Sequence, residues 1–371
     1  MRHRLASACC VLALLSVSPS ALAEMKASPV GDAAAHALDW RLLGPFRAGW
    51  AEMIDGSALR PDMFVMAAAG GGVWRTDNAG RTWTSLFDAG PTSAMGAVAI
   101  APSNPDVIYA GSGQPTPRYD VARGAGVFRS TDGGKTWSDL GLHDTGAVGR
   151  ILVDPKNPDK ALVAAVGHFF GPNPERGVFR TVDGGKTWSH VLKVDADTGA
   201  VDLSFDPADP NTVFAASWQA RQYPWQSYFT PIAGKGSALW RSDDGGATFR
   251  KLGGEGWPEG PLGRISVAAT RTKAGALRVY AMISADAKSG LYRSDDGGAH
   301  WARVNDEQAV TGYYSSHVTV APNDPDTVYL VGQSIRRCDQ GGAHCEIIRG
   351  SPGGDDYHFV WINQKDPTHW A

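Results

Sequence analysis

The sequence is poor in cysteine, in long apolar runs and in charge of one sign. It has 4 cysteines in 371 residues, and its formal net charge of −3 is spread without blocks of like charge. Nucleic-acid binding therefore has no electrostatic support. No segment beyond the N-terminus is apolar enough to cross a membrane, and no His-Glu-x-x-His or cysteine/histidine metal motif occurs. We expect no transmembrane segment, no metal, no cofactor and no nucleic-acid partner.

The first 23 residues are predicted to be a cleavable signal peptide. Arg2 and Arg4 give a positive start, residues 8–17 are apolar, and residues 21–23 form a small-residue cleavage signal. The apolar run is too short to span a bilayer. We therefore expect cleavage after Ala23 and a secreted or periplasmic protein. Residues 24–37 are expected to be a flexible N-terminal segment, and residues 38–371 a single propeller domain.

Glycine and proline are abundant, with 45 and 23 residues. They separate short β-rich runs, which is typical of many strands joined by tight turns, and no long stretch has helical periodicity. An eight-residue segment recurs at residues 76–83, 130–137, 181–188, 242–249 and 294–301. Such regular recurrence predicts a repeat architecture.

The recurring pattern, Ser/Thr-x-Asp-x-Gly-x-Thr/His-aromatic, is an Asp box, although its first copy has Asn78 in place of Asp. A carboxylate there can accept backbone N–H bonds at a hairpin turn, and the glycines can adopt positive φ. A calcium loop would need several further oxygen ligands. We interpret the box residues as structural: Asp132, Trp137, Asp183, Trp188, Asp244, Phe249, Asp296 and Trp301.

A second element precedes most boxes, namely a strand, a proline-containing turn and another strand. It occurs at residues 100–109, 153–162, 205–214 and 320–329. Each repeat then has four strands, A to D, with the A–B turn at the proline segment and the C–D turn at the box. Four-stranded repeats of about 50 residues predict an all-β propeller.

The sixth and seventh repeats depart from the pattern. Cys338 takes the Ser position and Cys345 the aromatic position of the sixth box, and two nearby cysteines in an exported protein predict a disulfide. A redox-active pair is the alternative. A seventh repeat begins at Tyr357, and the chain stops at Ala371. We expect six complete blades of a seven-bladed type, closed by residues 38–45 or truncated within the seventh blade; truncation is favoured.

These segments resemble the bacterial BNR-repeat, or Asp-box, "glycosyl hydrolase" family and the xyloglucanase-like and sortilin-like propellers grouped with it. The resemblance lies in residues 40–45, 70–74, 167–173, 218–221, 263–265 and 353–358. It implies a propeller, often within a longer two-propeller chain, and it does not imply a reaction.

Strand alternation sorts the loops by face. The A–B and C–D turns share one end of each blade, so the long B–C and D–A loops lie at the other end. Their aromatic and polar content suits binding of sugar or peptide, unless the loops pack their own aromatics. The candidate ligand-binding residues are Trp218, Gln219, Arg221, Trp225, Tyr228, Arg118, His168, Tyr314 and His358.

Four carboxylates are candidates for acid–base chemistry, because a glycosidase needs two carboxylates about 5–9.5 Å apart. They are Asp355, Asp356, Asp120 and Glu175. For Asp355 and Asp356 an ordinary turn is the alternative. Arg150 and Arg264 each open an A strand and can either bind an anion or pair with a carboxylate. A complete sialidase-type arginine triad is absent from the sequence.

Two function classes follow. In one, the protein is an O-glycosyl hydrolase or carbohydrate-binding protein acting on polysaccharide or oligosaccharide. In the other, it is a sortilin-like module that binds a peptide or protein on the long-loop face without catalysis. Carboxylate geometry on that face distinguishes the two.

Overall fold

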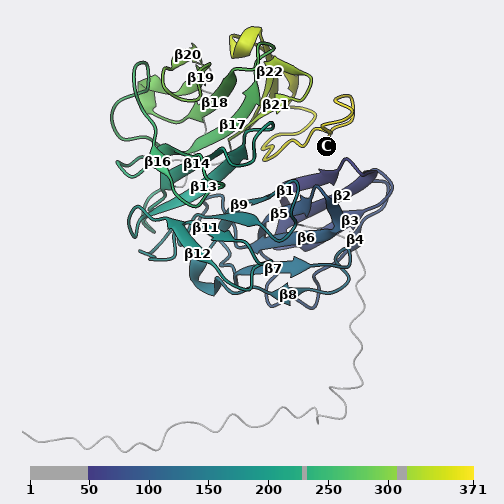
Figure 1. The fold of residues 1–371 in the computed structure, drawn as a ribbon. Coiled ribbons are helices and arrows are strands. Elements are labelled where there is room, and N and C mark those ends of the chain that lie inside the picture. Colours follow the sequence, from purple (N-terminus) through teal and green to yellow (C-terminus); the bar gives the residue numbers. More distant parts are fainter. Residues whose placement is uncertain (1–48, 228–231, 307–315) are drawn as a thin grey trace, which may run out of the picture. The chain divides into compact units, whose positions relative to one another are not determined.

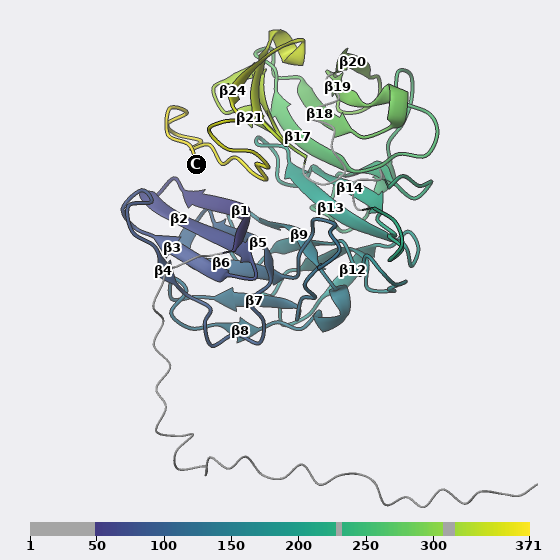
Figure 2. The ribbon, with the colours of Figure 1, turned by 180° about the vertical axis from the view of Figure 1, so that it is seen from behind.

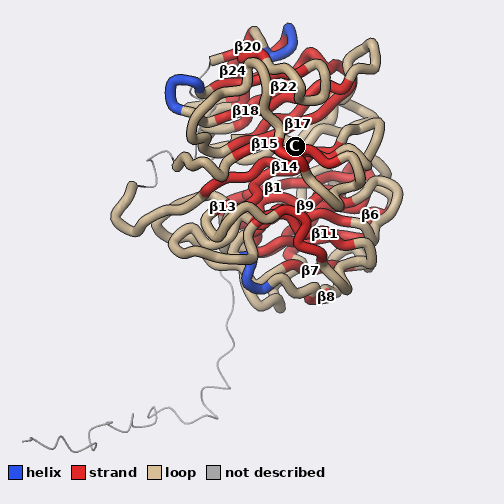
Figure 3. The backbone as a smooth tube through the Cα atoms, turned by 60° about the vertical axis from the view of Figure 1, so that its left-hand side comes forward, coloured by secondary structure: helices blue, strands red, loops and turns tan. Residues whose placement is uncertain are grey.

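Residues 49–227, 232–306 and 316–371, which the computed structural model describes, form six four-stranded antiparallel sheets (Figure 1). Helices within these ranges are short 3₁₀ turns at His143–Thr145, Asp286–Lys288 and Gln340–Gly342 (Figure 3). None of the helices described is long or apolar enough to be a membrane span. The predicted all-β fold of four-stranded blades is confirmed.

The strands follow the chain from one sheet to the next. The first sheet contains β1 (Trp50–Ser57), β2 (Arg60–Ala69), β3 (Gly72–Thr76) and β4 (Thr84–Ser85), and the second β5 (Met95–Ala101), β6 (Asn104–Ser112), β7 (Val127–Ser130) and β8 (Ser138–Asp139). The third contains β9 (Val148–Val153), β10 (Ala161–Ala165), β11 (Gly177–Thr181) and β12 (Ser189–Leu192). The fourth contains β13 (Thr198–Phe205), β14 (Val213–Gln219), β15 (Ala238–Ser242) and β16 (Arg250–Lys251). The fifth contains β17 (Ile265–Arg271), β18 (Leu277–Ile283), β19 (Gly290–Ser294) and β20 (Ala302–Asn305), and the sixth β21 (His317–Ala321), β22 (Asp324–Val331), β23 (Ile335–Asp339) and β24 (His344–Arg349).

The first strand of each sheet contacts the first strand of the next, from β1 to β5 and onward to β21. This is the blade-to-blade packing of a propeller. Small residues permit the close approach. In β5, for example, a Cβ on Gly96 would lie 2.3 Å from the carbonyl oxygen of Gly113 and 2.5 Å from that of Val148. Blades 1 to 6 below are these sheets in chain order.

The repeated segment forms the turn between the third and fourth strands of each of the first five blades, as residues 130–137 illustrate. The Asp132 carboxylate accepts hydrogen bonds from the Ser130 hydroxyl at 2.8 Å and the Thr136 backbone N–H at 2.9 Å. Gly133 and Gly134 adopt φ of 76° and 93°, which glycine tolerates best. The Trp137 indole N–H donates to the carbonyl of Leu86 in the preceding blade at 2.9 Å. This turn therefore both closes a hairpin and contacts the preceding blade.

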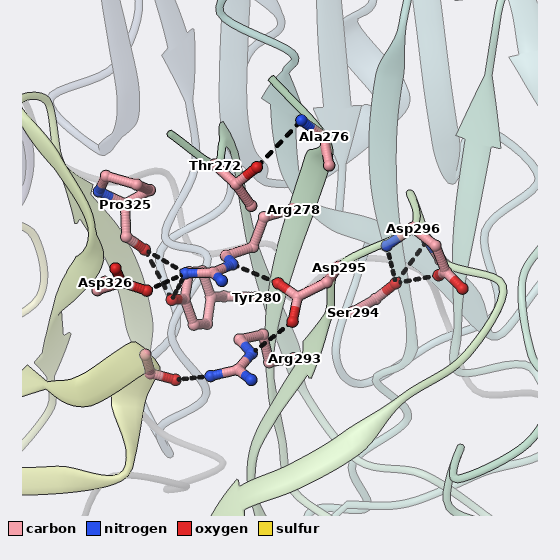
Figure 4. Close-up of polar contacts among 12 residues, drawn as sticks. Thr272, Ala276, Arg278, Tyr280, Arg293, Ser294, Asp295, Asp296, Pro325 and Asp326 are labelled. Atoms are coloured by element: carbon pink, nitrogen blue, oxygen red, sulfur yellow. Dashed lines mark hydrogen bonds and ion pairs between the residues drawn. The ribbon is translucent and has the colours of Figure 1, made fainter. Parts of the chain in front are cut away.

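An arginine on the third strand links each blade to the next one. Arg75 donates to the Gly133 carbonyl at 2.7 Å, and the same contact recurs from Arg129 to Gly184, Arg180 to Gly245, Arg241 to Gly297 and Arg293 to Gly341. Figure 4 shows the last of these arginines beside a second link between the same blades, in which the Tyr280 hydroxyl donates to the Pro325 carbonyl at 2.7 Å. The repeat therefore specifies the blade interfaces as well as the turns.

The sixth blade carries the predicted disulfide between Cys338 and Cys345. The two cysteines are directly paired across β23 and β24, so the bond joins the strands on either side of the turn at residues 339–344. The predicted pairing is confirmed.

Residues 353–371 lie beside the first blade (Figures 1 and 2) and also contact the sixth. Val360 and Ile362 pack against Val331 and Ile335 of the sixth blade. Trp361 makes an edge contact with Phe64 of β2, with ring centroids 5.3 Å apart. The start of the seventh repeat therefore bridges the two ends of the row of blades.

Candidate functional site

The strand order separates two sets of connections. The turns that follow the first and third strands of each blade leave from one end, which we call the turn face. The connections after the second and fourth strands leave from the other end, which we call the loop face. The long segments 113–126, 166–176 and 220–237 connect β6 to β7, β10 to β11 and β14 to β15, so they all belong to the loop face.

A hollow of about 500 Å³ opens where the first blade, the second-blade loop and the C-terminal segment meet. Its wall includes Trp50, Arg118, Asp355, Asp356 and Tyr357, and we call it the Asp355 pocket. The Arg118 guanidinium lies over the Trp50 ring, 3.9 Å from its centroid. Both aspartates are exposed, and Asp356 has a φ of 55°. Two carboxylates, a cation and an aromatic surface thus converge on one hollow.

The other two candidate acids lie outside the wall of this pocket. Asp120 is exposed and forms an ion pair with Arg118 at 3.4 Å. Glu175 accepts a hydrogen bond from the Asn173 amide at 3.1 Å within the next loop. The structure therefore brings together Asp355 and Asp356, joins Asp120 to them through Arg118, and places Glu175 in a different loop.

A second group of charged residues, which the sequence analysis missed in part, surrounds a cavity of about 30 Å³ next to the Asp355 pocket. We call it the axial cluster, because the first strands of several blades supply it. Its members are Glu52, Arg150, Asp202, Arg264, His317 and His358. A cavity of this size has room for about one water molecule and none for a sugar ring.

Glu52 joins three parts of the chain. Its carboxylate accepts a hydrogen bond from the Thr116 hydroxyl at 2.7 Å and lies 3.2 Å from Nδ1 of His358. Thr116 belongs to the second-blade loop, and His358 to the C-terminal segment. The glutamate side chain is buried, so these partners compensate a charge removed from water.

Asp202 is saturated with partners in the same way. It accepts hydrogen bonds from the Leu203 N–H at 2.9 Å, the Val267 N–H at 3.0 Å and the Ser266 hydroxyl at 2.6 Å. His317 lies 3.9 Å away. Ser266, His317 and Asp202 are not arranged as a nucleophilic triad, because the buried serine donates directly to the aspartate and accepts from the Val318 N–H at 3.1 Å.

The basic members of the cluster pair with its acids. Arg150 Nε lies 3.8 Å from Asp202, and its guanidinium is 4.6 Å from the Phe359 ring centroid. Burial lowers the pKa of Arg264, while the charges of Glu52 and Asp202 oppose that change. Burial, together with the Arg150 and Arg264 cations, holds the pKa of His317 well below its ordinary value. Arg150 thus lies within ion-pair distance of a carboxylate, and the charges of two carboxylates act on Arg264.

The predicted ligand aromatics divide into buried and exposed residues. Trp218 is 0% exposed, and its indole N–H donates to the Ile232 carbonyl at 3.0 Å, so its assignment as a ligand-contacting residue is wrong. Gln219 accepts from the Gly236 N–H at 3.1 Å and orders its own loop. Trp225 is exposed and stacks on Tyr223, which lies under the Arg221 guanidinium. His168 lines a separate hollow of about 270 Å³. Tyr228 and Tyr314 lie outside the described residues.

Comparison with known proteins places the chain among propellers of two kinds. The model of the family described as "Sortilin, neurotensin receptor 3" matches residues 125–255. A xyloglucanase of a Paenibacillus species is 27% identical over 278 residues, which make up 71% of this chain and 22% of the relative. The xyloglucanase Xgh74A of Acetivibrio thermocellus is 29% identical over 228 residues, 56% of this chain and 26% of the relative. The chain therefore spans about a quarter of the length of these relatives.

Solved structures show the same fold at lower identity. The GH74 xyloglucanase of Xanthomonas campestris superposes with a TM-score of 0.58 at 15% identity, over 79% of this chain and 45% of that one. A structure of YCF48 bound to a D1 peptide superposes with a TM-score of 0.51 at 13% identity, over 88% and 92% of the two chains. The chain is a glycosyl hydrolase-like β-propeller that resembles both xyloglucanases and the sortilin family.

Proposed function

We propose that this propeller binds a polysaccharide at the Asp355 pocket. The observation that carries the proposal is the convergence of Trp50, Arg118, Asp355 and Asp356 on a hollow of about 500 Å³. Ligand pockets typically measure about 300–1,000 Å³ and combine apolar surface with a few polar groups. The Arg118 guanidinium, held over the Trp50 ring, and the two carboxylates suit the hydroxyl groups of a sugar.

We further propose that Asp355 and Asp356 serve in O-glycosidic hydrolysis. One carboxylic acid would donate a proton to the glycosidic oxygen, and a second carboxylate would activate water or attack the sugar, at a separation of about 5–9.5 Å. Asp120, joined to the pocket through Arg118, is the alternative partner. The xyloglucanase relatives support this reaction class and make xyloglucan the first substrate to test.

The test uses a panel of polysaccharides that includes xyloglucan, assayed for binding by calorimetry and for hydrolysis by release of reducing ends. The variant is Asp356→Asn, because asparagine tolerates the left-handed φ of this position. The control is Asp62→Asn, which changes an exposed aspartate of β2. We expect at least tenfold weaker binding, or loss of hydrolysis, only for Asp356→Asn. Binding without turnover would reject the hydrolase assignment, and absence of binding to the whole panel would reject both assignments.

A sortilin-like peptide-binding module is the second candidate function. The sortilin family match favours it, because residues 125–255 include the long loops of the third and fourth blades. A peptide library screened against the same proteins tests this alternative. Selective binding of peptides, and of no glycan, would support it.

We also propose that the chain is exported after cleavage behind Ala23, that its repeated turns are Asp boxes, and that the propeller is of the seven-bladed type. The disulfide supports an oxidising compartment. The bonds made by Asp132 support the turn assignment, and residues 353–371, packed between the sixth and first blades, support a seventh position in the ring. N-terminal sequencing of the protein recovered from the periplasm or medium tests the cleavage.

A further inference from the structure

An exposed aromatic platform lies on the fourth-blade loop, away from the Asp355 pocket. The rings of Tyr223 and Trp225 are stacked, with centroids 5.1 Å apart and an angle of 19° between their planes. Trp225 is 81% exposed and Tyr223 is 42% exposed. Aromatic side chains of this size are normally buried in the core or at an interface. The pair therefore offers a flat surface to a ligand.

Polar groups beside the platform have unfilled hydrogen-bonding capacity. Arg221 Nη1 and Asp197 Oδ1 lie 3.7 Å apart, and neither makes a hydrogen bond. Gln222 is 1% exposed, and both atoms of its amide group lack a partner. Gln222 is too deeply buried to reach a ligand, whereas the Arg221 and Asp197 side chains are 22% and 42% exposed. Arg221 and Asp197 are therefore the charged groups beside the aromatic pair that ligand hydroxyls can contact.

The loops between the Asp355 pocket and the platform form a continuous series. Arg118 lines the pocket, and residues 121–123 of the same loop line the 270 Å³ hollow together with His168 and Phe170. A Cβ on the adjacent Gly171 would lie 3.9 Å from Arg221 Nη1. The Gln222 N–H donates to the Phe169 carbonyl at 2.8 Å. The second, third and fourth blades therefore present neighbouring loops in one line along the loop face.

We propose that the loop face binds an extended glycan chain along this line, with the Tyr223–Trp225 platform as a subsite distant from the Asp355 pocket. This proposal rests on the proposed function and adds a second subsite for the same polysaccharide, at the Tyr223–Trp225 platform. Flat aromatic surfaces separated by polar groups match the alternating ring faces and hydroxyls of a glycan. A peptide that binds by main-chain pairing would need an open strand edge, and this line consists of loops.

The test measures the affinity of intact xyloglucan and of xyloglucan fragments of increasing length by calorimetry. Wild-type affinity is expected to rise with length. Trp225→Ala should weaken binding of the polymer about five- to tenfold and leave the shortest bound fragment unaffected. Trp225→Phe, which retains a ring, should recover most of the loss. Leu59→Ala, which removes a side chain that is 51% exposed near a turn of the first blade, is the matched control.

The outcomes separate the two proposals. If Asp356→Asn weakens binding and Trp225→Ala does not, the extended site is wrong and the pocket assignment stands. Equal loss by Trp225→Ala for short and long fragments would also overturn the extended site. If the wild type does not bind xyloglucan, both proposals are wrong for this ligand. If the wild type instead binds peptides and Trp225→Ala abolishes that binding, the platform is assigned to a protein partner.

Discussion

The axial cluster and the Asp355 pocket are neighbours that use carboxylates in opposite ways. They share a wall formed by Met53, His358 and Phe359. On one side, Glu52 and Asp202 are buried and surrounded by donors. On the other side, Asp355 and Asp356 are exposed at the edge of a hollow. The contrast shows that residue type alone does not identify a functional acid; the partners already made by the carboxylate do.

The largest expected effect lies in the axial cluster. Asp202→Ala removes the acceptor of the Ser266 hydroxyl and of the Val267 N–H, and also the carboxylate 3.8 Å from Arg150 Nε. We therefore expect a loss of about 3–5 kcal/mol in the free energy of unfolding. Asp356→Asn should change it by less than about 0.5 kcal/mol, as an exposed substitution does. Urea unfolding followed by tryptophan fluorescence measures both. Similar losses of stability in Asp202→Ala and Asp356→Asn would contradict the proposed difference between the axial cluster and the Asp355 pocket.

The sixth blade provides an intermediate effect, because its turn is held by a covalent bond. Replacing both cysteines, Cys338→Ser with Cys345→Ser, should lower the free energy of unfolding by about 2.5 kcal/mol in the chain-entropy model for a loop of about eight residues. Glycan binding should be unchanged, since the disulfide lies outside both the pocket and the platform. Thermal unfolding with and without reductant checks this, and insensitivity of the wild type to reductant would contradict it.

The smallest expected effect concerns the turn face, where the carboxylates are satisfied yet exposed. The Thr187 hydroxyl and backbone lower the pKa of Asp183 to about 2, and Thr248 does the same for Asp244. Because these pKa values lie below the ordinary 3.8, the stability that they contribute is complete above about pH 4 and is lost as the pH falls through 2.

Thr187→Val removes the first of these hydrogen bonds and should raise the pKa of Asp183 towards its ordinary value. Acid unfolding should then begin at slightly higher pH. The measurement is the carboxyl titration of Asp183 by NMR, with Thr84→Val on the exposed strand β4 as control. An unchanged pKa in Thr187→Val would show that the backbone N–H bonds and the Thr181 hydroxyl hold the carboxylate without the Thr187 hydroxyl.

Features encoded within one repeat could be predicted from the sequence. The bonds of Asp132 reach residues only two to four positions away, and Cys338 and Cys345 are separated by seven. Such short-range contacts can be predicted because the spacing of the residues in the sequence nearly fixes the geometry of the turn. The strand order and the two faces then follow from repetition.

The axial cluster could not be predicted, since its contacts depend on bringing distant blades together. Ser266 bonds to Asp202 across 64 positions, and His358 lies beside Glu52 across 306. The only local sign of Asp202 was that it is the single charged residue of β13, where it follows Ala200 and Val201. Trp218 was misassigned for a related reason. It is the next-to-last residue of β14 and packs against Phe169 of the third-blade loop, with ring centroids 6.0 Å apart. No local pattern distinguishes it from the exposed Trp225.

In each arginine link between blades, the donor is synthesised before its acceptor. Arg75, Arg129, Arg180, Arg241 and Arg293 each donate to a turn that is synthesised after them. In a chain that emerges N-terminus first, each of these contacts can therefore form only after the next turn has emerged. The five links therefore join consecutive blades in one direction, from the third strand of the earlier blade to the turn of the later one.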